Sequence, residues 1–533
     1  MISESNIRVN RDLCYACGIC VERCILDNLR LSVAPCRSAC PINMNCQGYI
    51  RLLAQGKEKE AAEEMRLFTP FGAILGRVCS QPCEAYCERG KVDGPVHIRA
   101  IKRYLADYFP DIAFQTPPKQ DNDGKKVAVV GSGPAGLAAA YELSSRGHSV
   151  TIFEKENDLG GALRHIIPSF RLPVGIVDRT IEMLAKMGID FRTSQGVGQN
   201  VDFHWLEDHY DGIILAIGAN APMNFGFFGE DSDGVISGMD LLRKIKKGEQ
   251  IALGQSIIII GGGNSAVDAA LACKKLKITE VRIVCLEGRR EMPAFERELK
   301  EAEEEGVIIE AGWGPKRMEK NSKGKFTIEF MRCLSVFDSL KNFNPCFDPR
   351  CNLTLEADAV IAAIGQKVET VGFPDELIDP KLNLFAGDQV THQSLHHPKV
   401  FVCGDAFSGP SSVVHCINSG QEAAISLDRF LRGERLRWGR GFWTGPYVKD
   451  YKVDLSSAKG EGRGELNKLP VNKREINLET ETVFSSDQAR KEAERCLSCG
   501  RAVEWNKTCW YCLPCEIECP VRALEVRIPY LIR

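Results

Sequence analysis

The sequence lacks any long run of apolar residues and any strong excess of charge of one sign. The longest apolar runs, such as Ile257 to Ile260, are far shorter than the roughly 18 residues of a membrane-spanning helix, and we interpret them as buried strands. We therefore expect no membrane insertion. The 68 Lys and Arg residues nearly balance the 71 Asp and Glu residues, and the formal net charge of -3 argues against nucleic acid as the main partner.

The N-terminus, MISESNIRVN, is polar, so we expect no secretory signal in it. We therefore expect a cytoplasmic protein, in which the 23 cysteines serve metal or redox chemistry more often than disulfides. Sixteen of them lie in the ranges 14–87 and 496–519. The scattered remainder are expected to be small buried hydrophobic residues: Cys273, Cys285, Cys333, Cys346, Cys351, Cys403 and Cys416.

Residues 125–155 contain the G-x-G-x-x-G fingerprint of a dinucleotide site in its full context. An apolar strand, VAVV, leads into Gly131, Gly133 and Gly136; a helix follows, and a second strand ends at Glu154. The glycines let the backbone approach a pyrophosphate at a helix N-terminus, and Glu154 can accept hydrogen bonds from ribose hydroxyls. The pattern predicts a Rossmann-type unit that binds a dinucleotide.

A second unit reads IIIIGGGNSAVDAA, and its following strand ends at Glu287. Its fingerprint positions are Gly261, Gly263 and Ala266. Further on, the GD pair of VFVCGDAF returns the chain to the first unit, as in flavoproteins with two dinucleotide sites. We expect FAD on the first unit, with Asp405 at its ribityl or phosphate region, and the nicotinamide nucleotide on the second.

Residues from about 34 to 432 resemble the glutamate synthase small-subunit family. That family includes the N-terminal half of dihydropyrimidine dehydrogenase and the large subunit of NADH-dependent ferredoxin:NADP oxidoreductase. The resemblance is carried by these motifs: APCRSACP (34–41), GRVCSQPCEAYC (76–87), GPVHIRAIKR (94–103), GSGPAGLAAA, GGGNSAVDAA, REMPA (290–294) and CGDA (403–406). It implies hydride transfer from NAD(P)H to FAD and electron transfer onward through [4Fe–4S] clusters.

The resemblance also implies an α/β fold with two Rossmann-type, glutathione-reductase-like domains behind an α-helical iron–sulfur domain. The expected boundaries are 1–32 and 481–533 for the terminal iron–sulfur segments, 33–120 for the helical domain, 121–225 with 370–432 for FAD, 226–369 for NAD(P), and 433–480 for a linker. The cofactor-binding residues are expected to be Gly131, Gly133, Pro134, Ala135, Gly136, Glu154, Lys155, Gly161, Arg164, Gly261, Gly263, Asn264, Ser265, Ala266, Glu287, Gly365, Gly404, Asp405 and Val414.

One departure from the family bears on the choice of nucleotide. NADPH-using members usually carry Tyr-Arg-Arg before the E-M-P-A segment, and their arginines hold the 2′-phosphate. Here the corresponding residues are Cys285, Leu286 and Glu287. A carboxylate accepts from a free 2′-hydroxyl and repels a 2′-phosphate, so we predict NAD(H) over NADP(H). Arg289 and Arg290 argue the other way, and Glu287 as a solvated strand end is the remaining alternative.

The two ends of the chain carry the same cysteine spacing, C-x2-C-x2-C-x3-C. One run is CYACGICVERC, Cys14 to Cys24, and the other is CWYCLPCEIEC, Cys509 to Cys519. In such a run three thiolates bind one [4Fe–4S] cubane, and in two-cluster ferredoxins the fourth cysteine ligates the other cluster. Zinc sites more often use two separated C-x2-C pairs, so we favour iron–sulfur chemistry.

The sequences that flank both runs resemble the short strands of a two-cluster ferredoxin, although Ile25 stands where such proteins usually have proline. We predict that the two ends meet and build one ferredoxin-like α+β module. Its clusters would have these ligands: Cys14, Cys17, Cys20 and Cys519 for one, and Cys24, Cys509, Cys512 and Cys515 for the other. The alternative, in which each run ligates its own cluster, stays open.

The helical domain is expected to bind a third cluster. In the family that this chain resembles, a C-x2-C pair lies just before the segment that matches Cys36, and this chain has no such pair there. The C-terminal EAERCLSCG, which follows a capping box at 485–488, resembles that missing piece. The resemblance therefore implies these ligands: Cys36, Cys87, Cys496 and Cys499.

A fourth cluster would use Cys40, Cys79 and Cys83. The family's last ligand for it is Glu or Gln, and the corresponding residue here is Lys102, which cannot ligate while protonated. We predict that Cys46 replaces that ligand. The alternative is that Cys46 is a buried free thiol beside an incompletely ligated cluster.

We predict an NAD(P)H-dependent oxidoreductase that moves electrons between NAD(H), FAD and about four [4Fe–4S] clusters. No catalytic acid or base is evident, and hydride transfer needs none. The partner is expected to be a ferredoxin or a catalytic subunit of the aldehyde, formate or 2-oxoacid oxidoreductase type. The alternatives are a self-contained flavin reductase of a small molecule, a scaffold, and a thiol–disulfide reductase, although no C-x-x-C lies between Cys87 and Cys496.

Overall fold

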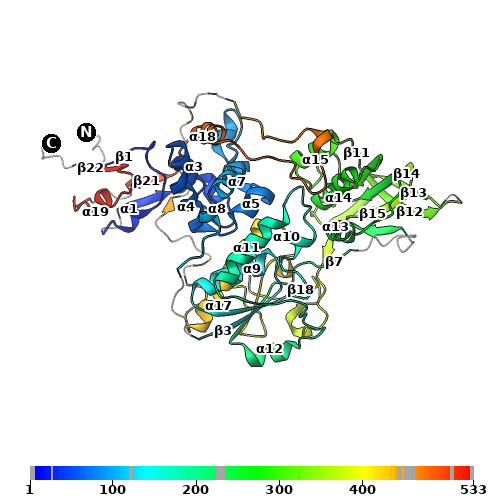
Figure 1. Cartoon of the computed structure of the whole chain (residues 1–533), viewed down its shortest axis with the longest axis horizontal. Helices are drawn as coiled ribbons and strands as arrows, with labels where there is room; N and C mark the ends of the chain where they lie inside the picture. The colour runs from blue at the N-terminus through cyan, green and yellow to red at the C-terminus, as the bar shows by residue number, and fades with distance from the viewer. Residues whose placement is uncertain are drawn as a thin grey trace.

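The computed structural model describes residues 6–25, 28–118, 124–223, 234–322, 324–438, 440, 447–448, 455, 458, 460, 462–504 and 509–527. Figure 1 shows the two chain ends at one extremity of the molecule and an antiparallel sheet at the other. Helices occupy the space between the chain ends and two parallel sheets. Within the described ranges no helix has the length and apolarity needed to span a bilayer.

The helical region combines N-terminal helices with one helix from near the C-terminus. Its helices are α2 (Pro35–Ser38), α3 (Cys46–Ala54), α4 (Glu58–Phe68), α5 (Gly72–Val78), α6 (Pro82–Ala85), α7 (Ile98–Tyr108), α8 (Pro110–Ala113) and α18 (Ser486–Glu494). The predicted capping box is confirmed, because the Ser485 side chain accepts from the Gln488 backbone and the Gln488 side chain accepts in return. Figure 1 shows α18 among the N-terminal helices, although it follows them by more than 370 residues in the sequence.

The first parallel sheet has the strand order β19-β6-β3-β4-β5. Its strands are β3 (Lys126–Val130), β4 (Ser149–Phe153), β5 (Asp190–Arg192), β6 (Gly212–Leu215) and β19 (Val400–Val402), and its helices include α9 (Pro134–Ser145), α10 (Ala162–His165), α11 (Val174–Lys186), α12 (Phe203–His209), α16 (Asp405–Ser408) and α17 (Val413–Leu431). Apart from the edge strand β5, the strands are largely buried and rich in Val, Ile and Leu, as expected where helices cover both faces. The predicted return of the chain to this sheet is confirmed by β19.

The second parallel sheet has the order β11-β10-β9-β15-β8. Its strands are β8 (Val235–Ser237), β9 (Ser256–Ile260), β10 (Glu280–Cys285), β11 (Ile308–Ala311) and β15 (Ala359–Ala362), with α13 (Gly238–Lys246), α14 (Asn264–Lys275) and α15 (Glu296–Glu304) beside it. The IIII run forms β9, a central strand whose last four residues are all buried. Two parallel Rossmann-like sheets were predicted, and both are present.

An antiparallel sheet of β12 (Trp313–Lys320), β13 (Phe326–Phe337) and β14 (Phe343–Ala357) projects beyond the second parallel sheet (Figure 1). This sheet corrects the expectation for two of the scattered cysteines. Cys346 and Cys351 are exposed, whereas the other five are buried. The reason is their place on β14, an edge strand of a sheet that extends away from the core.

The chain ends fold together. Strand β1 (Ile7–Val9) pairs antiparallel with β22 (Leu524–Val526), and β2 (Leu29–Ser32) pairs antiparallel with β21 (Arg501–Glu504) and parallel with β20 (Tyr447–Val448). Two short helices, α1 (Ile19–Glu22) and α19 (Pro514–Ile517), complete this part. Both ends contribute buried side chains to one core, which includes Ile7, Leu29, Leu31, Leu524 and Val526.

Residues 462–485 lead into α18 and lie against two other parts of the protein. On the helical side, Arg77 Nε lies 2.9 Å from Glu479 Oε1 and Arg99 Nη2 lies 2.6 Å from Glu481 Oε1. On the side of the second sheet, Arg474 Nη1 lies 3.1 Å from Oε1 of Glu305, the residue that follows α15. The described part of the linker is therefore docked by ion pairs with largely buried guanidinium groups rather than free in solvent.

Candidate functional site

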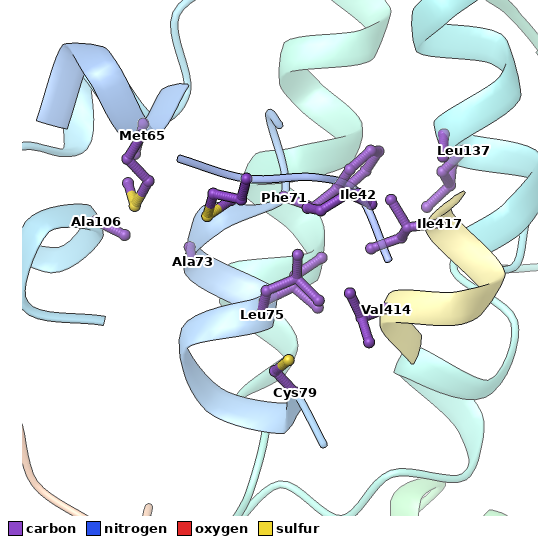
Figure 2. Close-up of a cluster of buried hydrophobic side chains, with 14 of the residues drawn as sticks. Ile42, Met65, Phe71, Ala73, Leu75, Cys79, Ala106, Leu137, Val414 and Ile417 are labelled. Atoms are coloured by element: carbon purple, nitrogen blue, oxygen red, sulfur yellow. The ribbon is translucent and has the colours of Figure 1, made fainter. Parts of the chain in front are cut away.

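A cavity of about 700 Å³ lies between the two Rossmann units and reaches the helical region. Its wall includes the glycine turn after β3, the residues that open α14, and Arg77 and Val78 at the end of α5. Figure 2 shows how α5 is fixed there: Leu75 faces Val414 and Ile417 of α17, near Leu137 of α9. One apolar core thus joins the helical region to the helices that carry the first nucleotide site.

The glycine turn of the first unit has the close backbone approach that a dinucleotide site needs. A Cβ on Gly136 would lie 1.9 Å from the Gly131 carbonyl oxygen, so only glycine fits. The Glu154 carboxylate accepts hydrogen bonds from the Ser132 backbone at 2.9 Å and from its hydroxyl at 2.6 Å. The acidic residue is thereby held at the edge of the cleft, where a ribose would lie. These residues fit an FAD nucleotide.

The structure brings most of the predicted cofactor-binding residues to this cleft. The residues that line it are Gly131, Gly133, Pro134, Ala135, Glu154, Lys155, Gly161, Asn264, Ser265, Gly365, Gly404 and Asp405. Seven predicted residues are not part of this lining. Five of them belong to the two glycine fingerprints or follow β10: Gly136, Gly261, Gly263, Ala266 and Glu287. The other two lie elsewhere for clear reasons. Val414 is 1% exposed and packs in the core of Figure 2, while Val413 lines the cleft; the Arg164 guanidinium pairs with Asp178.

Sequence reasoning missed the loops that follow β5 and β6. Residues 195–199 and 216–220 line the cleft. Their signal was available, because both segments come directly after strands of the parallel sheet, and ligands bind outside the carboxyl ends of such strands. Arg77 and Val78 were also missed; these residues precede a cysteine motif and have no local signal for a nucleotide.

The second unit places Glu287 against its own glycine turn. A Cβ on Gly262 would lie 2.6 Å from Glu287 Oε2, so this carboxylate stands beside the turn that a bound nucleotide would contact. Arg289 is occupied by two carboxylates of α15, with Nη1 2.9 Å from Glu296 and Nε 3.0 Å from Glu303. Arg290 is exposed. The acidic residue is therefore near the turn, whereas the nearest arginine is held by other partners.

The terminal cysteines form two groups, each with members from both ends of the chain. The Cys14 group lines one small cavity and consists of Cys14, Cys17, Cys20 and Cys519. The Cys24 group lines another and consists of Cys24, Cys509, Cys512 and Cys515. The grouping follows from the pairing of β1 with β22 and from the packing of α1 beside α19, which set the two runs side by side.

The helical region holds two further groups. The Cys36 group lines a cavity between α2 and the end of α18 and consists of Cys36, Cys87, Cys496 and Cys499. The Cys40 group consists of Cys40, Cys46, Cys79 and Cys83, in which the Cys46 thiol interacts with those of Cys40 and Cys83. Cys46 also interacts with Cys36, so it lies between the two groups.

The Cys40 group is buried and contains a thiol prepared to ionise. The neighbouring Cys46 thiol outweighs the opposing effect of burial and, together with the Lys102 ammonium, lowers the pKa of Cys40 to about 6. Burial raises the pKa of Cys79, and Lys102 opposes that effect. Metal ligation requires thiolates, so a nearby cation favours it.

Among the described residues, no three His, Cys, Asp or Glu side chains converge tightly enough to bind one metal ion. The thiolates of a cubane contact different iron atoms and therefore surround a volume rather than a point. Four groups, each of four cysteine thiols, provide the donor sets that [4Fe–4S] clusters require. The residues present fit such clusters.

The groups form a series that begins at the nucleotide cleft. Val78 lines the cleft and Cys79 follows it, while Ser80 hydrogen-bonds to the cleft residue Ser412 at 3.1 Å. The Cys36 group comes next through Cys46. The Cys14 group is joined to it through α3, because Asn45 donates to the Tyr15 carbonyl at 3.1 Å.

Two family models match this chain. The pyridine nucleotide-disulphide oxidoreductase model matches residues 125–420, and the model of dihydropyrimidine dehydrogenase domain II, with its 4Fe–4S cluster, matches residues 20–113. The NADP(+)-dependent formate dehydrogenase subunit beta of Moorella thermoacetica is 33% identical over 504 residues, which cover 88% of this chain and 71% of that protein.

The NAD-dependent dihydropyrimidine dehydrogenase subunit PreT of Escherichia coli K12 is 32% identical, over 75% of this chain and 92% of that protein. A solved structure of FprA from Mycobacterium tuberculosis in complex with NADPH has a TM-score of 0.52 and 19% identity. It covers 58% of this chain and 85% of that chain, and supports the fold alone. The chain belongs to the glutamate synthase small-subunit-like family of NAD(P)H-dependent FAD and [4Fe–4S] oxidoreductases, together with the N-terminal part of dihydropyrimidine dehydrogenase.

Proposed function

We propose that this chain is the electron-transfer subunit of a larger oxidoreductase, which exchanges electrons between NAD(H) and a partner through FAD and four [4Fe–4S] clusters. Bound flavin supplies the conversion between a hydride and single electrons. The observation that carries the proposal is the continuous series of four cysteine groups between the nucleotide cleft and the end of the molecule where both chain termini lie (Figure 1).

The Cys40 group would hold the cluster nearest the flavin, because Cys79 directly follows a residue of the cleft wall. The Cys36 group would follow, since the Cys46 thiol interacts with members of both groups. This contact also supports Cys46 as the fourth ligand of the first cluster. The chain supplies an apolar, buried path here: Cys46 is 0% exposed and the neighbouring Tyr49 is also 0% exposed, so water is excluded from the relay.

The Cys14 and Cys24 groups would hold the last two clusters in one ferredoxin-like module. Three observations support a module made from both chain ends: the β1–β22 pair, the shared apolar core, and the mixed origin of each cysteine group. If each run ligated its own cluster, the fourth cysteine of each run would have to leave the cavity that it now lines. The shared arrangement needs no such change.

We propose NAD(H) as the nucleotide. The Glu287 carboxylate beside Gly262 favours a ribose with free hydroxyls, and its negative charge disfavours a 2′-phosphate. Arg289 would first have to leave Glu296 and Glu303 before it could bind a phosphate. The two relatives described above differ in this respect, since one is named for NADP(+) and the other for NAD.

The partner would dock at the end that carries the Cys24 group, where Cys512 is exposed. The relatives from Moorella thermoacetica and Escherichia coli are both named as subunits, of a formate dehydrogenase and of a dihydropyrimidine dehydrogenase. By analogy with them we propose a catalytic redox subunit as the partner, with a ferredoxin as the alternative electron carrier.

Anaerobically purified protein tests the cofactor set. We expect about 16 iron, 16 acid-labile sulfide and one FAD per chain. NADH should reduce the flavin and then produce the electron paramagnetic resonance (EPR) signals of reduced clusters. A content of about 8 iron with bound zinc would contradict the terminal module, while about 12 iron would contradict one ligand set, and the variants described below identify which.

A further inference from the structure

Lys102 is a buried cation in the part of the protein nearest the nucleotide cleft. It lies on α7 and is only 2% exposed. Burying an ammonium group is unfavourable unless an opposite charge or several hydrogen-bond acceptors compensate for it. The neighbouring buried cations of α7 have such compensation: Arg99 pairs with Glu481, and Arg103 pairs with Asp107 and Glu479.

The partners of Lys102 are of another kind. Helix α7 packs closely against the end of α5, because a Cβ on Gly76 would lie 2.7 Å from the Arg103 Cα, and Cys79 directly follows α5. Among the described residues Lys102 forms no ion pair with a carboxylate, and the groups that raise its pKa are the four thiols of the Cys40 group. A carboxylate that acts on this group belongs to Glu84, which raises the pKa of Cys83. That carboxylate is already used, because it accepts from Arg463 at 2.6 Å and from the Arg99 backbone at 2.9 Å.

All four thiols therefore share one buried cation that has no other anionic partner in the described structure. We propose that Lys102 is the resident counter-charge of the cluster held by the Cys40 group, and that it raises the reduction potential of this cluster. The inference rests on the proposed function, which assigns a [4Fe–4S] cluster to this group.

The physical reason is the charge that reduction adds. A cubane with four thiolates is already anionic, and an additional electron makes it more so. In a buried site the electrostatic effect of a fixed positive charge is weakly screened, so it stabilises the reduced state more than the oxidised state. The cluster beside the flavin would thus accept electrons more readily than the same four thiolates without Lys102.

The test compares Lys102→Met and Lys102→Gln, which remove the charge, with Lys102→Arg, which keeps it. Arg103→Met is the matched control, because it removes a buried cation from the next residue of α7 that pairs with carboxylates. Redox titration monitored by EPR spectroscopy, with iron analysis of each variant, gives the potentials of the individual clusters. We expect the neutral variants to weaken reduction of one cluster about tenfold, which corresponds to about 59 mV for one electron.

The potential of that cluster should stay close to the wild-type value in Lys102→Arg and Arg103→Met, and the other three clusters should shift less. If the neutral variants lose the cluster while Lys102→Arg retains it, the cluster requires a positive charge at this position and the proposal stands. Unchanged potentials in both neutral variants would overturn it.

A [3Fe–4S] signal in Lys102→Met that is absent from Cys46→Ser would also overturn the proposal, since Lys102 would then be an iron ligand. Loss of the cluster from Lys102→Arg as well would indicate a steric role and have the same consequence. A wild-type protein with about 12 iron and no cluster at the Cys40 group would instead show that the proposed function fails at this site.

Discussion

Replacing Glu287 with alanine is expected to abolish the preference for NADH over NADPH. The carboxylate follows β10 and lies so close to the glycine turn that a Cβ on Gly262 would be 2.6 Å from Glu287 Oε2. The position is half-buried, so an interaction with a bound ribose would be screened less than at the surface. The variant removes one charge without removing a side chain from the apolar core.

The magnitude follows from two terms. Hydrogen bonds from a neutral ribose to a charged acceptor contribute about 1.5–3 kcal/mol, so NADH should bind roughly 10- to 150-fold more weakly to the variant. Two like charges about 4 Å apart repel by about 1–4 kcal/mol at effective dielectric constants between 80 and 20, so NADPH should gain at least about fivefold. Together the ratio of the two nucleotides should shift by about two orders of magnitude.

Anaerobic stopped-flow reduction of the bound flavin measures this ratio directly, as the second-order rate constants for NADH and NADPH. Glu291→Ala is the matched control, because it removes an exposed carboxylate from the same segment and should leave the ratio unchanged. A wild-type protein that prefers NADPH, or a Glu287→Ala variant with the wild-type ratio, would refute the reasoning and make Glu287 a solvated strand end.

Three further predictions concern the cysteine groups and the linker. Cys519→Ser should perturb the EPR signal of the same cluster as Cys14→Ser, whereas local ligation would make Cys519→Ser resemble Cys512→Ser instead. Burial lowers the pKa of His97 to about 4, so its neutral form is favoured in the folded protein. As pH falls from about 6.5 to 4, the unfolded chain binds a proton before the folded protein does, and about 3 kcal/mol of stability should be lost. Proteolysis of residues 463–481 should report this loss, and His97→Gln should remove its pH dependence. Ser485→Ala should lower the free energy of unfolding by about 1 kcal/mol in chemical denaturation, because it removes the cap of α18, and an unchanged midpoint would contradict that role.

The two parallel sheets and their nucleotide turns could be predicted because their signals are local. Runs of buried aliphatic residues, glycine turns and acidic strand ends each lie within about thirty residues of sequence. The same holds for the capping box at Ser485. The grouping of cysteines could be proposed because ligand spacing itself carries information about which thiolates share a cluster.

The remaining features depend on contacts that leave no local pattern. The ion pair between Arg77 and Glu479 joins residues 402 positions apart, and no sequence pattern near either residue predicts this pairing. Whether Val413 or Val414 of α17 faces the cleft depends on the rotation of that helix against α5 (Figure 2). The exposure of Cys346 depends on how far the β13–β14 sheet projects, which residue types alone do not state.

The proposed terminal module raises the question of what brings the chain ends together. Closing a flexible linker of the length of 433–480 costs about 3 kcal/mol of entropy. Burying the side chains of Ile7, Leu524 and Val526 contributes about 1.5–3 kcal/mol each, which already exceeds that cost. The ion pairs of the linker have a smaller net effect, because desolvation of the buried guanidinium groups offsets most of their attraction. The apolar core of the module therefore decides that the ends meet, and the ion pairs decide the path by which the linker reaches them.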